Sequence, residues 1–160
     1  MERIEFTVPG LSTGQGRARF ARVGKGVRTY ERTEDMEAKD RVGWYFMQAA
    51  PNHKLWVGPV EMRIECTFPW PKSWPRWMRE WAAAERRLYL KKPDASNVLK
   101  LVEDALGSPK RQVAMRDDCV VTPDGPHRYY VQSDDEPPCM LVRMTHRPEL
   151  LPTKPTEKRR

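Results

Sequence analysis

The chain has 160 residues and a formal net charge of +7, with 29 lysines and arginines against 22 aspartates and glutamates. This length suits one domain with a buried core. No run approaches the ~20 apolar residues that cross a bilayer, and the first residues do not resemble a signal peptide. The three cysteines have no CxxC spacing, which argues against a zinc site or a disulfide framework. We therefore expect a cytoplasmic protein without a membrane partner, and the positive charge favours a polyanionic partner.

The first predicted element is a strand over residues 3–8, where apolar and polar side chains alternate. Residues 10–30 follow as a predicted loop, rich in glycine and basic residues and without an acidic one. A solvated loop with surface charge is one interpretation. We favour a DNA-contacting loop because charge of a single sign suits a phosphate backbone, and its contact residues would be Arg17, Arg19, Arg22, Lys25 and Arg28.

A helix capped by Thr33 is predicted to run to about residue 50. Its core-facing side chains would be Met36, Val42 and Phe46. Residues 60–68 then alternate strictly and give the clearest strand signal in the chain, with Cys66 in the core. The three histidines, His53, His127 and His146, match no catalytic spacing, so we interpret them as structural or surface residues.

The next segment is rich in tryptophan. A turn-rich stretch over residues 69–75 precedes a second predicted helix over residues 75–89. Four indole side chains lie close together in this part of the sequence: Trp70, Trp74, Trp77 and Trp81. We expect them to pack against the core or a subunit partner, and stacking on DNA bases is the alternative.

A third helix is predicted over residues 94–106, capped by Asp94 or Ser96. Its apolar stripe contains Val98, Val102 and Ala105, and its polar face contains Asn97, Lys100 and Asp104. Strands are predicted from about residue 119 and over residues 140–144. We expect the domain to span residues 1–147 and a flexible basic tail to span residues 148–160.

Two acidic positions have the chemistry of a metal site. Asp94 begins the third helix, and Asp117 and Asp118 stand at the entry of a later strand. Converging carboxylates bind hard cations such as Mg²⁺, and a bound Mg²⁺ can activate a hydrolytic water at a phosphodiester. The alternative is structural: Asp94 caps a helix, and the acidic pair forms a turn.

The sequence KPDASNVLKLVEDAL over residues 92–106, followed by RDDCVV over residues 116–121, resembles the signature of the RusA family of Holliday junction resolvases. The family pattern is K-P-D-x-D-N-x-x-K-x-x-x-D-A-L and then D-D-x-x-V. Weaker similarities lie in the loop around Arg19, in residues 71–74 and in residues 127–129, so the resemblance spans about residues 3–145.

The resemblance implies an α+β fold: a single domain whose mixed β-sheet is packed by about three helices, working as a homodimer. It implies a magnesium-dependent endodeoxyribonuclease of bacterial or phage origin. Such an enzyme resolves four-way junctions by paired nicks in DNA recombination and repair. Mn²⁺ can substitute for Mg²⁺, and no nucleotide cofactor is needed. By position, the catalytic residues are Asp94, Lys100 and Asp118, the metal ligands are Asp94, Asp117 and Asp118, and the supporting residues are Ser96, Asn97 and Asp104.

One position departs from the family pattern, because Ser96 replaces the second aspartate of D-x-D. Another acid can compensate, and the candidates are Asp117, Glu65 and Glu103; this is the interpretation that we favour. Alternatively, the metal binds more loosely and needs higher Mg²⁺ or Mn²⁺. The remaining alternatives are a non-cleaving dimer that binds branched DNA and a metal-dependent nuclease with little junction preference.

Overall fold

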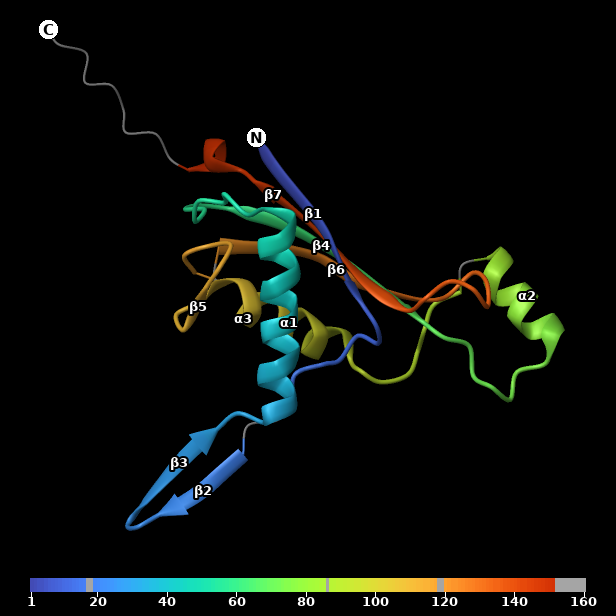
Figure 1. The fold of residues 1–160 in the computed structure, drawn as a ribbon, viewed down its shortest axis with the longest axis horizontal. Helices are drawn as coiled ribbons and strands as arrows, with labels where there is room; N and C mark the ends of the chain where they lie inside the picture. Colours follow the sequence, from blue (N-terminus) through green and yellow to red (C-terminus); the bar gives the residue numbers. More distant parts are fainter. Residues whose placement is uncertain (17–18, 86, 118–119, 152–160) are drawn as a thin grey trace, which may run out of the picture.

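A four-stranded mixed sheet forms the centre of the fold. The structure is a computed structural model and describes residues 1–16, 19–85, 87–117 and 120–151. The strand order is β1-β7-β4-β6, with bounds β1 Glu2–Pro9, β4 Val60–Phe68, β6 Val121–Tyr130 and β7 Cys139–His146. Strand β7 pairs antiparallel with β1 and β4, whereas β4 and β6 run parallel. The predicted α+β class with a mixed sheet is therefore confirmed (Figure 1).

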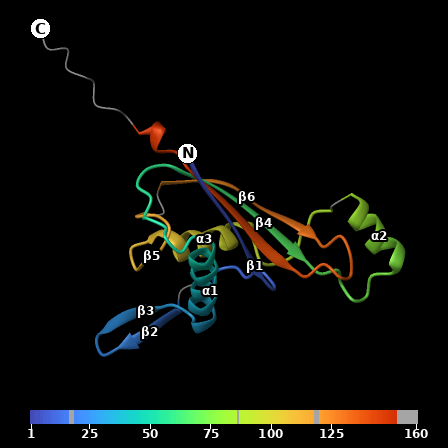
Figure 2. The same ribbon diagram turned by 45° about the horizontal axis from the view of Figure 1, so that its top comes forward.

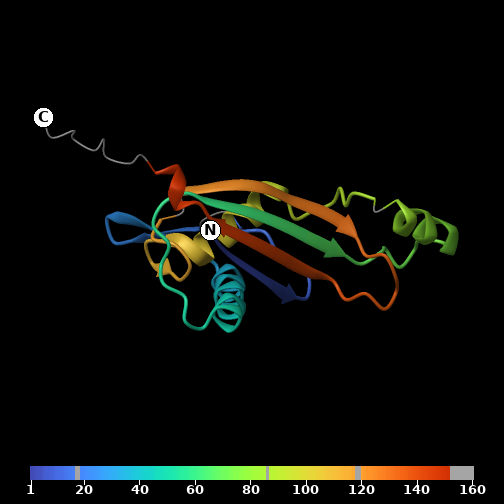
Figure 3. The same ribbon diagram turned by 90° about the horizontal axis from the view of Figure 1, so that it is seen from above.

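Two helices cover one face of this sheet (Figure 3). Helix α1 spans Thr33–Ala49 and helix α3 spans Ala95–Gly107. The buried side chains of α1 include Val42 and Phe46, as predicted, but Met36 is exposed and that prediction was wrong. Arg32, not Thr33, occupies the N-cap position of α1, without a side-chain cap bond. The apolar stripe predicted for α3 is buried in the shared core.

Other elements differ from the sequence-based expectation. The predicted basic loop contains a hairpin, β2 (Arg19–Val23) and β3 (Gly26–Tyr30). Gly24 has φ +61° at its turn, a left-handed conformation that glycine adopts at little cost. Helix α2 (Arg76–Ala84) ends earlier than predicted. Residues 148–150, expected in the tail, form a short 3₁₀ helix, and residues 152–160 lie outside the described part.

The opposite face of the sheet carries a network of ion pairs. Arg143 binds Glu5 at 2.6 Å and Glu65 at 2.9 Å, while Arg63 binds Glu65 at 2.9 Å and Asp124 at 2.7 Å. Because these arginines already have carboxylate partners, this face offers few free cations to a phosphate backbone. No helix of the described residues has the length and apolar character of a membrane span.

Two structural predictions for single residues are confirmed. His53 Nε2 lies 2.7 Å from the carbonyl oxygen of Ala114, and its ring packs edge-on against Phe46 and Trp56. Cys66 is fully buried in β4, and this burial raises the pKa of its thiol to about 11. A thiol in this environment stays neutral and packs as a small apolar side chain.

Candidate functional site

Asp94 stands immediately before α3, where the chain turns from an extended segment into the helix. It occupies the N-cap position with φ −68° and ψ 145°. Its backbone oxygen accepts hydrogen bonds from the N–H groups of Asn97 and Val98, both at 3.1 Å. Its side chain makes no cap hydrogen bond, and the residue is exposed. The carboxylate at the start of α3 is therefore accessible to a ligand.

The segment that leads into Asp94 is fixed to the sheet. Arg128 on β6 donates to the carbonyl oxygens of Lys91 at 2.9 Å and Pro93 at 2.8 Å. Tyr89 donates from its hydroxyl to the carbonyl oxygen of Lys92 at 2.9 Å. These bonds tie the backbone on the N-terminal side of Asp94 to the end of β6, so the carboxylate is held on a rigid part of the fold.

The loop after β1 packs directly on the start of α3. The N–H of Gln15 donates to the carbonyl oxygen of Asn97 at 2.9 Å. A Cβ atom on Gly14 would lie 2.9 Å from the Cβ of Asn97 and 3.0 Å from the Cβ of Pro93. Only glycine allows so close an approach, since any side chain would push the loop away from the helix.

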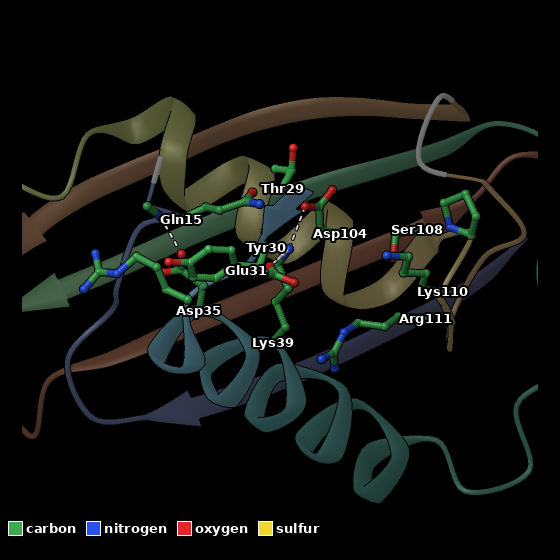
Figure 4. A pocket seen from close by; sticks show the side chains of 13 residues that line it. Gln15, Thr29, Tyr30, Glu31, Asp35, Lys39, Asp104, Ser108, Lys110 and Arg111 are labelled. Carbon is green, nitrogen blue, oxygen red and sulfur yellow. Dashed lines mark hydrogen bonds and ion pairs between the residues drawn. The ribbon is translucent and has the colours of Figure 1, made fainter. Parts of the chain in front are cut away.

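The polar face of α3 divides into two parts. Ser96, Asn97 and Lys100 are exposed within the first two turns. Asp104 lies one turn further on and pairs with the Nζ of Lys39 at 2.7 Å. Lys39 comes from α1, is only 4% exposed and also pairs with Glu31. The carboxylate of Asp104 therefore takes part in a buried contact between two helices (Figure 4).

An open pocket of about 450 Å³ surrounds this ion pair. It lies between the base of the hairpin, α1, the second half of α3 and the turn at residues 108–111 (Figure 4). On its wall Asp35 accepts the N–H of Gly16 at 3.1 Å. Of the predicted site residues in the described part of the chain, only Asp104 lines it. The pocket therefore opens beside the second half of α3, while Gln15 on its wall bonds to Asn97 in the first turn of the helix.

The structure does not bring Asp94 and Asp117 together within one chain. The 13 residues of α3 lie between them in the sequence and span about 20 Å. Ala114 and Met115 donate their N–H groups to the carbonyl oxygen of Leu106, in the last turn of α3, at 2.9 and 3.3 Å, and Asp117 follows two residues later. Asp117 therefore lies beyond the C-terminal end of α3.

The pairing of Asp94 with Asp118 stays a prediction, because Asp118 lies outside the described residues. Within residues 1–16, 19–85, 87–117 and 120–151, no group of three or more His, Cys, Asp or Glu side chains forms a metal-binding cluster.

The basic hairpin projects from the body of the molecule (Figure 1; Figure 2). Both of its strands are almost entirely exposed, and the described basic residues on it are Arg19, Arg22, Lys25 and Arg28. Arg17, which belongs to the same prediction, lies outside the described residues. The exposed ring of Phe20 stands among these charges.

Several residues that shape the site were not predicted from the sequence. Lys39 falls on the same helical stripe as Asp35, Val42 and Phe46, all of which are buried. A lysine on a core-facing stripe needs a carboxylate partner, and this signal was available in the sequence. The contact of Gly14 with α3 and the bonds of Arg128 had no such local signal, because they join segments far apart in the chain.

The chain matches a known protein-family model. The model of the family Endodeoxyribonuclease RusA matches residues 9–133 of the 160-residue chain. The matched range contains the hairpin, α1, α2, α3 and the parallel strands β4 and β6. The search of curated proteins found no match.

Proposed function

The family model matches more than half of the chain, so the chain belongs to the RusA family of endodeoxyribonucleases, and we propose that it resolves four-way DNA junctions by paired nicks. The observation that carries this proposal is the start of α3, where an exposed Asp94 without a cap bond shares one helix with the exposed Lys100. A carboxylate that can bind a cation and an ammonium group that can bind a phosphate therefore lie within two helical turns of each other.

An exposed carboxylate suits a hard divalent cation, which prefers oxygen ligands. We assign Asp94, with the acidic pair Asp117 and Asp118, to hold Mg²⁺. A bound Mg²⁺ would supply a Lewis acid that activates water and stabilises charge on the phosphate. Lys100 would offset the charge that develops on the phosphate oxygens. The N–H groups of Ala95 and Ser96, which precede the first backbone bonds to Asp94, can donate to the same phosphate.

Paired nicks require two equivalent sites, so the proposal includes a two-fold homodimer. A second copy would also supply the missing ligands. Since α3 separates Asp94 from Asp117 within one chain, we infer that Asp94 of one protomer works with the acidic pair of the other. The hairpin charges of each protomer would contact the phosphate backbone beside the site.

Ser96 supports a second candidate function, a dimer that binds branched DNA without cutting it. A hydroxyl in place of a carboxylate removes one negative charge beside Asp94, which weakens cation binding. This alternative makes a distinct prediction, because the wild-type protein would bind junctions tightly and nick none of them at any Mg²⁺ or Mn²⁺ concentration.

The test is a nicking assay on an end-labelled synthetic four-way junction in Mg²⁺, with the matching linear duplex as competitor. We expect symmetric paired nicks from the wild type. Asp94→Asn and Lys100→Ala should bind the junction but nick it on the order of 10²–10³-fold more slowly. Glu37→Gln, at an exposed position on α1, is the matched control and should nick normally.

Two results would contradict the proposal. Equal nicking by Asp94→Asn and the wild type would remove Asp94 from the site. Equal cutting of junction and duplex by the wild type would leave a nuclease without junction selectivity.

A further inference from the structure

The positive charge of the protein is concentrated in two segments. Residues 16–30, which include the hairpin, contain five basic and no acidic residues, a net charge of +5. Residues 70–93, here called the α2 arm, contain seven basic and two acidic residues, again a net charge of +5. The rest of the chain therefore carries a net charge of −3. Figure 1 shows α2 beyond the end of the sheet, on the other side of the molecule from the hairpin.

Helix α2 has little contact with the body, and Ala82 is its only buried residue. Trp77 is 65% exposed and Trp81 is 45% exposed, and a spacing of four residues places both on one side of the helix. The guanidinium of Arg87 lies 4.1 Å from the ring centroid of Trp81. Trp74, by contrast, packs on Tyr130 at 4.7 Å between centroids. The packing predicted for the tryptophans thus describes Trp74, and it leaves two indoles exposed.

Charge decides which partner suits this surface. An apolar protein partner would bury exposed cations of the arm, such as Lys72, Lys91 and Lys92, away from water at a large cost. A nucleic acid satisfies both features, since its phosphates bind the cations and its bases stack on the indoles. Within the arm, Arg76, Arg79 and Arg87 already pair with Glu80, Asp134 and Glu85, so the cations that the arm presents to phosphates are chiefly its exposed lysines. The ion-paired face of the sheet has no exposed indole among the described residues.

The arm is joined rigidly to the start of α3. The N–H of Tyr89 donates to the carbonyl oxygen of Arg128 at 2.9 Å, and Arg128 holds the carbonyl oxygen of Pro93 at 2.8 Å. Lys91 and Lys92 lie exposed between α2 and Asp94. A strand bound on α2 can follow these lysines to the carboxylate.

We propose that the α2 arm is a second DNA-binding site, which stacks unpaired bases of the substrate on Trp77 and Trp81. This inference rests on the proposed nuclease function and adds a substrate class to it, namely DNA with bases that are free to leave the stack. The charges of the hairpin would contact phosphates, whereas the arm would contact both phosphates and bases.

The test measures binding to a four-way junction in the absence of divalent cations. Trp77→Ala and Trp81→Ala should each weaken binding about 5- to 150-fold, the range found for loss of one base–aromatic stack. Trp77→Phe should retain most of the affinity because it keeps an aromatic face. Trp44→Ala is the matched control, since Trp44 is 50% exposed on α1, and it should bind like the wild type.

Stacking itself is read from 2-aminopurine placed at the branch point of the junction. We expect the wild type to quench its fluorescence and Trp77→Ala to lose that quenching. Thermal unfolding of each variant checks that the fold is intact, and sedimentation without DNA gives the oligomeric state.

The outcomes separate this inference from the function on which it rests. If the wild type binds and nicks junctions while Trp77→Ala and Trp81→Ala match Trp44→Ala in affinity and quenching, the role of the arm is refuted and the nuclease stands. If either arm variant dissociates a dimer without DNA, the arm is a subunit contact and the inference is also refuted. A wild type that neither binds nor nicks junctions refutes the proposed function itself.

Discussion

The two aspartates of α3 show how one helix serves two purposes. Asp94 precedes the helix, is exposed and has no side-chain cap bond. Asp104 lies ten residues later and is bound to the buried Lys39. Both match the same family motif, yet the first carboxylate is free to bind a ligand and the second joins α3 to α1. Position in a motif therefore does not determine a residue's role, because the surroundings of each carboxylate decide it.

The largest effect is expected when the same substitution is made separately at each of the two aspartates. Asp94→Asn should lower the nicking rate on the order of 10²–10³-fold and leave the melting temperature unchanged. Asp104→Asn should lower the melting temperature and retain nicking below it, because it weakens a buried ion pair. Junction nicking and thermal unfolding of both variants check this contrast. If both variants lose activity at full stability, the division between the two aspartates is wrong.

Removing the charge of Lys39, which pairs with both Glu31 and Asp104, should have the next largest effect. Lys39→Met leaves Glu31 and Asp104 without their common partner, which we expect to cost about 3 kcal/mol. For a chain of this size that corresponds to a fall of about 6–12 °C in melting temperature. Calorimetry measures it, and Lys54→Met, at an exposed position, should change stability by less than about 0.5 kcal/mol. An unchanged melting temperature for Lys39→Met would contradict a stabilising role for this network.

A smaller effect is expected at Gly14, where the loop contacts the start of α3. Gly14→Ala should destabilise the protein by about 1–3 kcal/mol, because the added methyl group would overlap Asn97 and Pro93. The control is Gly43→Ala on α1, where a Cβ would meet Val113 Cγ2 at an ordinary 3.8 Å. That change should stabilise the helix. Urea unfolding measures the change in the free energy of unfolding for both variants. Changes of the same sign would contradict the tight contact at Gly14.

The mildest change concerns Ser96. Ser96→Asp restores a carboxylate beside Asp94, and we expect it to lower the Mg²⁺ concentration for half-maximal nicking about tenfold, or 1.4 kcal/mol. Ser96→Asn is the matched neutral control. A magnesium titration of the nicking rate separates the two variants. An identical Mg²⁺ requirement for both would show that residue 96 does not contribute to cation binding.

Local patterns were sufficient for part of the fold. The sequence predicts the strand over Val60–Phe68 to the residue because its alternate apolar side chains are buried, whereas Glu61 and Arg63 between them are exposed. The hairpin was missed because both faces of β2 and β3 meet solvent, so their sequences lack the alternation that marks a half-buried strand.

The candidate site was predictable in its residues but not in its arrangement. The motif identified Asp94 and Lys100, since they lie within one short segment. The distance between Asp94 and Asp117 depends instead on how α3 runs along the sheet and on where β6 begins. The spacing of residues along one sequence does not reveal long-range topology of this kind.

The central claim is that Asp94 of one protomer works with the acidic pair of the other, and mixing two inactive variants tests it most directly. Asp94→Asn and Asp118→Asn should each fail to nick a junction. A mixed dimer of the two contains one site with both substitutions and one site with none, so the account predicts that mixing restores a single nick per junction. A mixture as inactive as its components, with mixed dimers demonstrated by mass spectrometry, would contradict the shared site.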